Sequence, residues 1–135
     1  MKHIIDNTDL VFTFVKKYYP IKRGDGQKGL GLVSDSEMVA GVIYDEYNGH
    51  NIFMHVAARH EKNWLTREYL RLSFHYPFNQ LGCSRVTGWI EDSNTKSKRF
   101  AEHLGFKKEA VLNGAATDGG DVILYRMLRE ECKYV

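Results

Sequence analysis

Apolar side chains recur along the chain with two different periods. Over residues 7–20 they fall at every third or fourth position, which predicts an amphipathic helix that Asn7 or Thr8 caps and that Pro20 ends. Residues 38–47 are instead rich in β-branched and aromatic side chains, which favours a strand. The chain therefore alternates between helical and extended segments, as an α/β domain does.

The middle of the chain predicts a strand, a helix and a second strand in succession. The Asn48-Gly49 pair is typical of a hairpin turn, and the following residues 51–58 are nearly all apolar, which indicates a central strand buried on both faces. Thr66 is a candidate cap for a helix that Pro77 kinks, and residues 85–90 form the next strand. Two strands joined by a helix in this way lie parallel in one sheet, with a right-handed crossover.

A third helix is expected from a polar cap, Ser93 or Asn94, to Gly105, which ends it. The remaining strands are expected at residues 2–5, 30–33, 106–112 and 121–128. The order β-α-β-β-β-α-β-α-β-β predicts an α/β fold with a mixed sheet, built as one domain over residues 1–135. In this fold a central twisted sheet combines parallel and antiparallel pairs and carries helices on both faces.

Two polar, glycine-rich segments, 21–31 and 113–120, are expected to be loops. Ligands of open α/β sheets bind beyond the carboxyl ends of parallel strands. The candidate site therefore lies around residues 56–67 and 91–97, and the two loops are expected to border it.

Composition narrows the class of protein. The 135 residues are 43% hydrophobic and 27% charged, a balance typical of a globular domain. Nineteen basic and seventeen acidic side chains leave a net charge of +2, which is too small to indicate a nucleic-acid partner. No apolar run approaches the roughly eighteen residues of a membrane span, and Asp6 interrupts the start before the core of a signal peptide can form.

The cysteines and histidines show no pattern of a metal site. Cys83 and Cys132 form no CxxC pair and are expected to be reduced thiols, which favours the cytoplasm. His55 and His60 are five positions apart, and His75 stands alone. We therefore expect a protein that works without a metal.

One segment of the second half carries a more specific pattern. The strand at residues 85–90 is followed by Asn94-Thr95-Lys96-Ser97, and then by a helix that ends in Leu104-Gly105-Phe106 with Glu109 three positions on. This ordered set resembles the fifth strand, fourth helix and sixth strand of the GNAT superfamily of N-acetyltransferases. The resemblance extends over residues 52–132. Residues 118–128 are similar to the branch that acetylates the N-termini of ribosomal proteins, and segments 64–67, 76–78 and 129–132 look like small phage-encoded members.

The resemblance implies acetyl-CoA as the acetyl donor. Its pantetheine arm would pair with the main chain of Val56, Ala57 and Ala58, where the central strand leaves its neighbour. Its phosphates would contact the start of the following helix, where free N–H groups favour an anion. The further residues implied in binding are Trp64, Leu65, Thr66, Arg67, Asn94, Ser97 and Arg99. Both glycines of the family's phosphate loop are absent from this sequence.

Acetyl transfer to an amine needs a base for the amine and an acid for the leaving thiolate. The tyrosine acid of the family, seven residues after Asn94, corresponds to Ala101 here. The candidates that could replace it are His55 on the central strand, Tyr125 on the last strand and Ser97 at the start of the helix. A lone histidine on an apolar strand is more often a satisfied core residue, and a base acting through water would need no particular side chain.

The expected function is transfer of an acetyl group from acetyl-CoA to an amine, by direct attack in a ternary complex. A protein N-terminus, a lysine, a polyamine or an amino sugar fits as acceptor. One alternative is a catalytically inactive binding protein of the same fold, which Ala101 and the missing glycines favour. Another is an interaction module for nucleic acid or a host protein, using the aromatic and basic residues 18–23. The same cluster and the aromatic run 74–78 leave a homodimer open.

Overall fold

The computed structural model describes residues 1–59 and 65–135, and its elements follow the predicted order. They are β1 (Lys2–Ile5), α1 (Thr8–Lys16), β2 (Lys28–Ser34), β3 (Glu37–Asp45), β4 (Asn51–Ala58), α2 (Arg67–His75), β5 (Arg85–Glu91), α3 (Thr95–Leu104), β6 (Lys107–Leu112) and β7 (Val122–Leu128). A π-helical turn at Tyr76–Gln80 follows α2, and a short 3₁₀ turn at Arg129–Glu131 follows β7.

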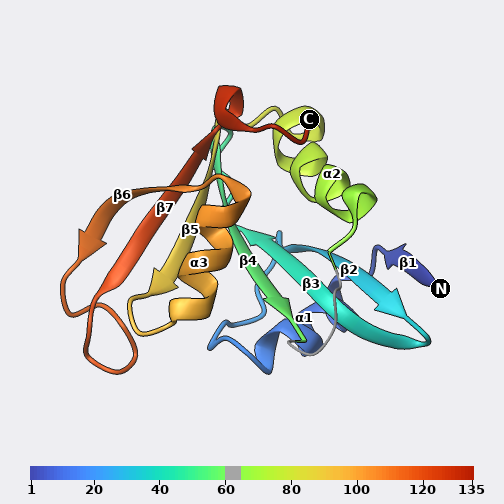
Figure 1. The fold of residues 1–135 in the computed structure, drawn as a ribbon, viewed down its shortest axis with the longest axis horizontal. Coiled ribbons are helices and arrows are strands. Elements are labelled where there is room, and N and C mark those ends of the chain that lie inside the picture. Colours follow the sequence, from blue (N-terminus) through green and yellow to red (C-terminus); the bar gives the residue numbers. More distant parts are fainter. Residues whose placement is uncertain (60–64) are drawn as a thin grey trace.

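The strands form one seven-stranded sheet in the order β1-β2-β3-β4-β5-β7-β6. The pair β4–β5 is parallel and the other pairs are antiparallel, which confirms the predicted mixed sheet. The parallel pairing runs from Asn51 opposite Arg85 only as far as Phe53 opposite Thr87. Beyond that point the two strands diverge toward their carboxyl ends (Figure 1).

Helices cover both faces of the sheet, as predicted. On one face, Val11 and Val15 of α1 pack against Ile43 of β3 and Ala57 of β4. On the other face, α2 and α3 close the larger core, whose fully buried aromatic residues include Phe74. The periodicity of the sequence thus placed the apolar stripe of each helix against the sheet.

The helix ends confirm the capping residues read from the sequence. The side chains of Asn7, Thr66 and Asn94 each accept a hydrogen bond at 3.1 Å from the N–H three residues on. Gly105 ends α3 in the left-handed region with φ 112°, a conformation that a side chain disfavours. The kink expected at Pro77 is the π-helical turn, which accommodates a residue without an N–H.

Two sequence-based expectations are corrected. β4 is not buried on both faces, because Phe53 and His55 on one face are half-buried whereas Ile52 and Met54 on the other are buried. The loop expected at 21–31 is shorter, since β2 begins at Lys28, which pairs with Tyr44 of β3. A strand partner and an apolar helix above override the loop-forming tendency of the glycines in this segment.

Gly29 of β2 lies directly beneath α1, and we expect its replacement by alanine to destabilise the fold. An added Cβ would lie 2.9 Å from Val11 Cβ and 3.1 Å from Thr8 Cα, so helix and sheet would have to separate. We expect Gly29→Ala to lower the free energy of unfolding by about 1–3 kcal/mol in urea titrations. The matched control is Gly24→Ala, whose Cβ meets nothing within 4 Å. Equal stability of the two variants would contradict this packing.

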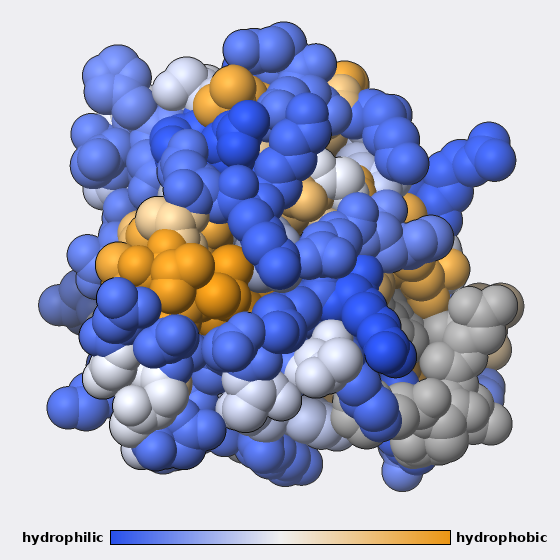
Figure 2. Space-filling view, turned by 60° about the vertical axis from the view of Figure 1, so that its left-hand side comes forward, coloured by the Kyte–Doolittle hydropathy of each residue, from blue (hydrophilic) through white to orange (hydrophobic). Residues whose placement is uncertain are grey.

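The surface is mostly polar. The face shown in Figure 2 is largely hydrophilic, with its most prominent apolar patch at the left and smaller apolar areas elsewhere. Among the helices of the described residues, none is both long enough and apolar enough to cross a bilayer. Apolar side chains are concentrated instead in the two cores on either side of the sheet.

Candidate active site

The divergence of β4 and β5 leaves main-chain groups of β4 without a strand beside them. Just before β4, the carbonyl of His50 accepts a hydrogen bond from the N–H of Arg85 at 3.2 Å, on the β5 side. Main-chain groups of successive residues in a strand point to opposite neighbours, so every second residue from His50 shares this direction. The N–H and C=O groups of Val56 and Ala58 therefore point into the gap, beyond the last β4–β5 pair.

Two large cavities meet at this gap. One, of about 630 Å³, lies between the loop that follows α1 and the carboxyl ends of β3, β4 and β5. The other, of about 300 Å³, lies between residues 56–58 of β4 and the first turns of α3. Tyr18, Tyr19 and Asn94 line both cavities. The two cavities therefore lie on either side of the β4 edge that faces the gap.

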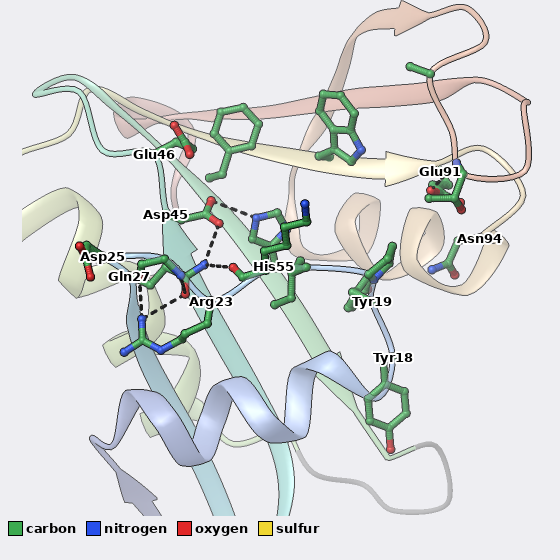
Figure 3. Close-up of a pocket in the computed structure, with 18 residues that line it drawn as sticks. Tyr18, Tyr19, Arg23, Asp25, Gln27, Asp45, Glu46, His55, Glu91 and Asn94 are labelled. Carbon is green, nitrogen blue, oxygen red and sulfur yellow. Dashed lines mark hydrogen bonds and ion pairs between the residues drawn. The ribbon is translucent and has the colours of Figure 1, made fainter.

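A histidine–carboxylate pair lies in the larger cavity (Figure 3). His55 Nε2 is 3.1 Å from Asp45 Oδ1, and the two side chains are only 14% and 19% exposed. Gln27 donates to the other oxygen of Asp45 at 3.4 Å. The carboxylate orients the imidazole, and an imidazole is a side chain that can accept a proton from a ligand in this cavity.

Carboxylates and aromatic rings make up much of the remaining wall. Glu91 at the end of β5 accepts hydrogen bonds from the N–H and the hydroxyl of Thr117, both at 2.9 Å. Asp25 and Glu46 line the same cavity, and so do the rings of Phe53 and Trp89. Negative charges beside aromatic faces favour a positively charged ligand.

The smaller cavity brings together several of the residues predicted to bind the acetyl donor. Val56, Ala57 and Ala58 form its β4 wall, while Asn94, Ser97 and others line the α3 side. Asn94 caps α3 through the N–H of Ser97, so its side chain stands at the positive end of the helix. Lys96 adds a cationic side chain at this wall.

Tyr19 stands where the cavities join. Its hydroxyl is 2.7 Å from Ser97 Oγ, a contact that ties the loop after α1 to the first turn of α3. Burial raises the pKa of the Tyr19 phenol, and the hydrogen bond with Ser97 opposes that effect in part. In Figure 3 Tyr19 lies beside Asn94, whereas Tyr18 points away from His55.

The other predicted residues lie in different surroundings. Thr66 caps α2 and is half-buried, Arg67 is exposed at the start of the same helix, and Arg99 is exposed on α3. Leu65 packs into an apolar pocket between α2 and β4 that Phe100 also lines. Trp64 lies outside the described residues.

Tyr125 is not brought to either large cavity. Its buried hydroxyl donates to Glu102 Oε2 at 2.7 Å, and its pKa is raised, first by burial and then by the neighbouring carboxylate. Tyr125 pairs with Gly88 of β5 and packs within the larger core instead.

Asp45 and Tyr19 line the candidate site, and sequence reasoning did not place them there. Asp45 pairs with Phe53 in the β3–β4 ladder, two positions from His55 on the same strand face. The hairpin register could have suggested this diagonal contact once the turn length was known. No sequence signal pointed to Tyr19 meeting Ser97, which is 78 positions away. Within residues 1–59 and 65–135, no group of three or more side chains could hold a metal ion.

Comparison with known proteins identifies the fold. No family model and no curated protein matches the sequence. A solved structure of the spermidine/spermine N-acetyltransferase SpeG from Vibrio cholerae is similar, with a TM-score of 0.77 at 12% identity over 96% of this chain and 96% of that one. A second SpeG structure, of a mutant form, gives 0.78 at 12% identity over 99% and 96%.

A third structure, of a protein assigned as an acetyltransferase, gives a TM-score of 0.67 at 22% identity over 80% of this chain. This chain spans 62% of the length of that protein. The shared architecture shows that the chain has the fold of these N-acetyltransferases. The fold class predicted from the sequence is therefore confirmed.

Proposed function

We propose that the protein transfers the acetyl group of acetyl-CoA to an amine by direct attack in a ternary complex. The observation that carries the proposal is the meeting of two cavities at the open edge of β4, with the His55–Asp45 pair on one side. The donor would enter through the smaller cavity and the acceptor through the larger one. The two free thiols, Cys83 and Cys132, suit a reducing compartment, and the cytoplasm is part of the same proposal.

The smaller cavity fits the acetyl donor. Among the described residues no strand pairs with Val56 and Ala58 on the β5 side, so their main-chain groups can hydrogen-bond an extended amide-containing arm. The N-termini of α2 and α3 favour phosphate, and Arg67 and Lys96 add positive charge. The free N–H groups at the N-termini of α2 and α3 can bind phosphate in place of the family's glycine-containing loop, because such groups do not depend on glycine.

The larger cavity fits a positively charged amine. The carboxylates of Asp25, Glu46 and Glu91 attract the ammonium form, and Phe53 and Trp89 cover its aliphatic part. The SpeG structures are named for acetylation of spermidine, a polyamine of this charge. A small cationic amine and an amine carried by a protein are both compatible with a cavity of about 630 Å³.

Each residue of the site has a chemical task in this proposal. His55 takes a proton from the acceptor nitrogen, and Asp45 holds the imidazole in place and balances the charge it gains. A main-chain N–H of β4 stabilises the oxygen on which negative charge develops during transfer. The site also holds donor and acceptor close together at the gap between β4 and β5, which accounts for much of the remaining increase in the rate of transfer.

Calorimetric titration with acetyl-CoA tests the donor side. We expect Arg67→Ala to raise Kd about tenfold, because it removes a charge-assisted contact with phosphate. Thr66→Ala is expected to weaken binding by a smaller factor and to destabilise α2 through loss of its cap. The matched control is Arg71→Ala on the same helix, where the side chain pairs with Glu68 at the surface.

The same titration, combined with an amine-acceptor screen, separates this proposal from an inactive binding protein of the same fold. The specific observation behind that alternative is Ala101, a buried methyl group at the position of the family's tyrosine. Saturable binding without turnover on any amine would favour it. If the protein does not bind acetyl-CoA at millimolar concentration, both the proposed acetyltransferase and the inactive acetyl-CoA-binding protein are contradicted.

A further inference from the structure

The proposed reaction leaves one proton without a source. When the bond between the acetyl carbon and sulfur breaks, the sulfur departs as a thiolate and needs a proton. The methyl side chain of Ala101 carries no acidic proton, and the hydroxyl of Tyr125 donates to Glu102 within the core. The donor must therefore be sought among the hydroxyl groups at the junction of the cavities.

Tyr19 is the hydroxyl that the geometry places there. It lines the larger cavity, the smaller cavity and the narrow pocket of about 50 Å³ between β4, β5 and α3. His55 and Ser97 line that narrow pocket as well. The phenol thus stands on the α3 side of the opening, while His55 faces the acceptor side (Figure 3).

We propose that Tyr19 is the general acid that protonates the leaving thiolate of coenzyme A. This inference rests on the proposed acetyl transfer. The acceptor nitrogen forms a bond to the acetyl carbon, the carbon–sulfur bond breaks, and the phenolic proton passes to sulfur to give the free thiol. A bound ammonium first loses one proton to water, which frees its lone pair for the attack. The second proton, which the nitrogen loses after the attack, goes to His55. It returns to the Tyr19 phenolate through water after the products leave, so the cycle consumes no proton.

The surroundings of Tyr19 suit this role. Ser97 Oγ, 2.7 Å away, directs the hydroxyl toward the first turn of α3, where the positive end of the helix favours a developing anion. A phenol is protonated at neutral pH. Burial raises the pKa of Tyr19, and the hydrogen bond with Ser97 opposes that rise. Ser97 is therefore a positioning residue for the phenol.

Kinetics of Tyr19→Phe give the first test. The change removes only the hydroxyl, and we expect kcat with acetyl-CoA to fall about 100-fold while KM for the amine changes little. The control is Tyr47→Phe, which also loses a hydrogen-bonded hydroxyl but lies in the β3–β4 loop, where it donates to the Leu81 carbonyl. Ser97→Ala is expected to lower kcat about tenfold, because the phenol loses its orientation.

Changing the leaving group separates acid catalysis from positioning. With an aryl thioacetate, whose thiol is far more acidic, the leaving sulfur needs no proton. We expect Tyr19→Phe and the unchanged protein to differ by less than about threefold on that donor. An equal loss of kcat on both donors would overturn the acid role, and so would a Tyr19→Phe variant with full activity on acetyl-CoA.

A binding measurement tests the contact without turnover. If the phenol reaches the sulfur, coenzyme A should bind about fivefold more tightly than desulfo-coenzyme A, and Tyr19→Phe should abolish the difference. Equal binding of the two ligands by the unchanged protein overturns the inference about Tyr19. Absence of turnover with every amine, together with the fivefold difference in binding, would instead overturn the proposed function and leave the contact established.

Discussion

Replacement of His55 by glutamine is expected to lower kcat for amine acetylation about 1000-fold, the largest effect on activity among the changes considered. The imidazole takes the proton of the acceptor nitrogen, and an amide of similar size cannot. Because glutamine can still donate to Asp45, the shape of the cavity and the binding of the acceptor should be retained. Steady-state kinetics with a small cationic amine give kcat and KM separately.

His50→Gln is the matched control for this experiment. His50 is exposed in the β3–β4 loop, and its main-chain carbonyl accepts hydrogen bonds from the N–H groups of Ser84 and Arg85. The same substitution there should leave kcat unchanged. Retention of more than about a third of the activity by His55→Gln would show that the acceptor loses its proton without this side chain.

The largest expected effect on stability is that of Phe74→Ala. The ring of Phe74 is fully buried on α2, with ring centroids 5.0 Å from Tyr134, 6.1 Å from Phe106 and 6.4 Å from Phe78. It thereby joins α2 to the C-terminal tail, which returns to this helix (Figure 1). Removing the ring leaves a cavity that its neighbours cannot fill, and we expect the free energy of unfolding to fall by about 3–5 kcal/mol.

Urea titration followed by circular dichroism measures this loss. Leu10→Ala on α1 is the control, because Leu10 is 56% exposed and its truncation should change the stability by less than about 0.5 kcal/mol. A Phe74→Ala variant within about 1 kcal/mol of the unchanged protein would show that the tail and α2 are not packed as described.

Sequence reasoning gave the correct structural role for residues whose surroundings are local. Asn94 and Thr66 were expected as helix caps, and each caps its helix. Val56, Ala57 and Ala58 were expected beside a cofactor arm and line the smaller cavity, although their role in binding stays a proposal. Tyr125 lay on the expected strand, but the direction of its side chain followed from the packing of α3 against that strand.

The residues that sequence reasoning missed are brought in by contacts across the fold. The contact between Asp45 and His55 depends on the register of β3 against β4. The contact between Tyr19 and Ser97 depends on how α1 and α3 are placed on opposite sides of the β4–β5 gap. The burial of β4 was overestimated for a related reason. An apolar composition favours burial, but it carries no information on where a neighbouring strand departs.

By itself the sequence determined the order of the ten helices and strands, the caps and turns between them, and the parallel β4–β5 pair, because these depend on residues a few positions apart. Tertiary structure alone decided where β4 and β5 part, which cavity each side chain enters, and which hydroxyl stands at their junction. Those features depend on sheet twist and on the packing of α1 and α3 over long separations along the chain, and local propensity does not encode either.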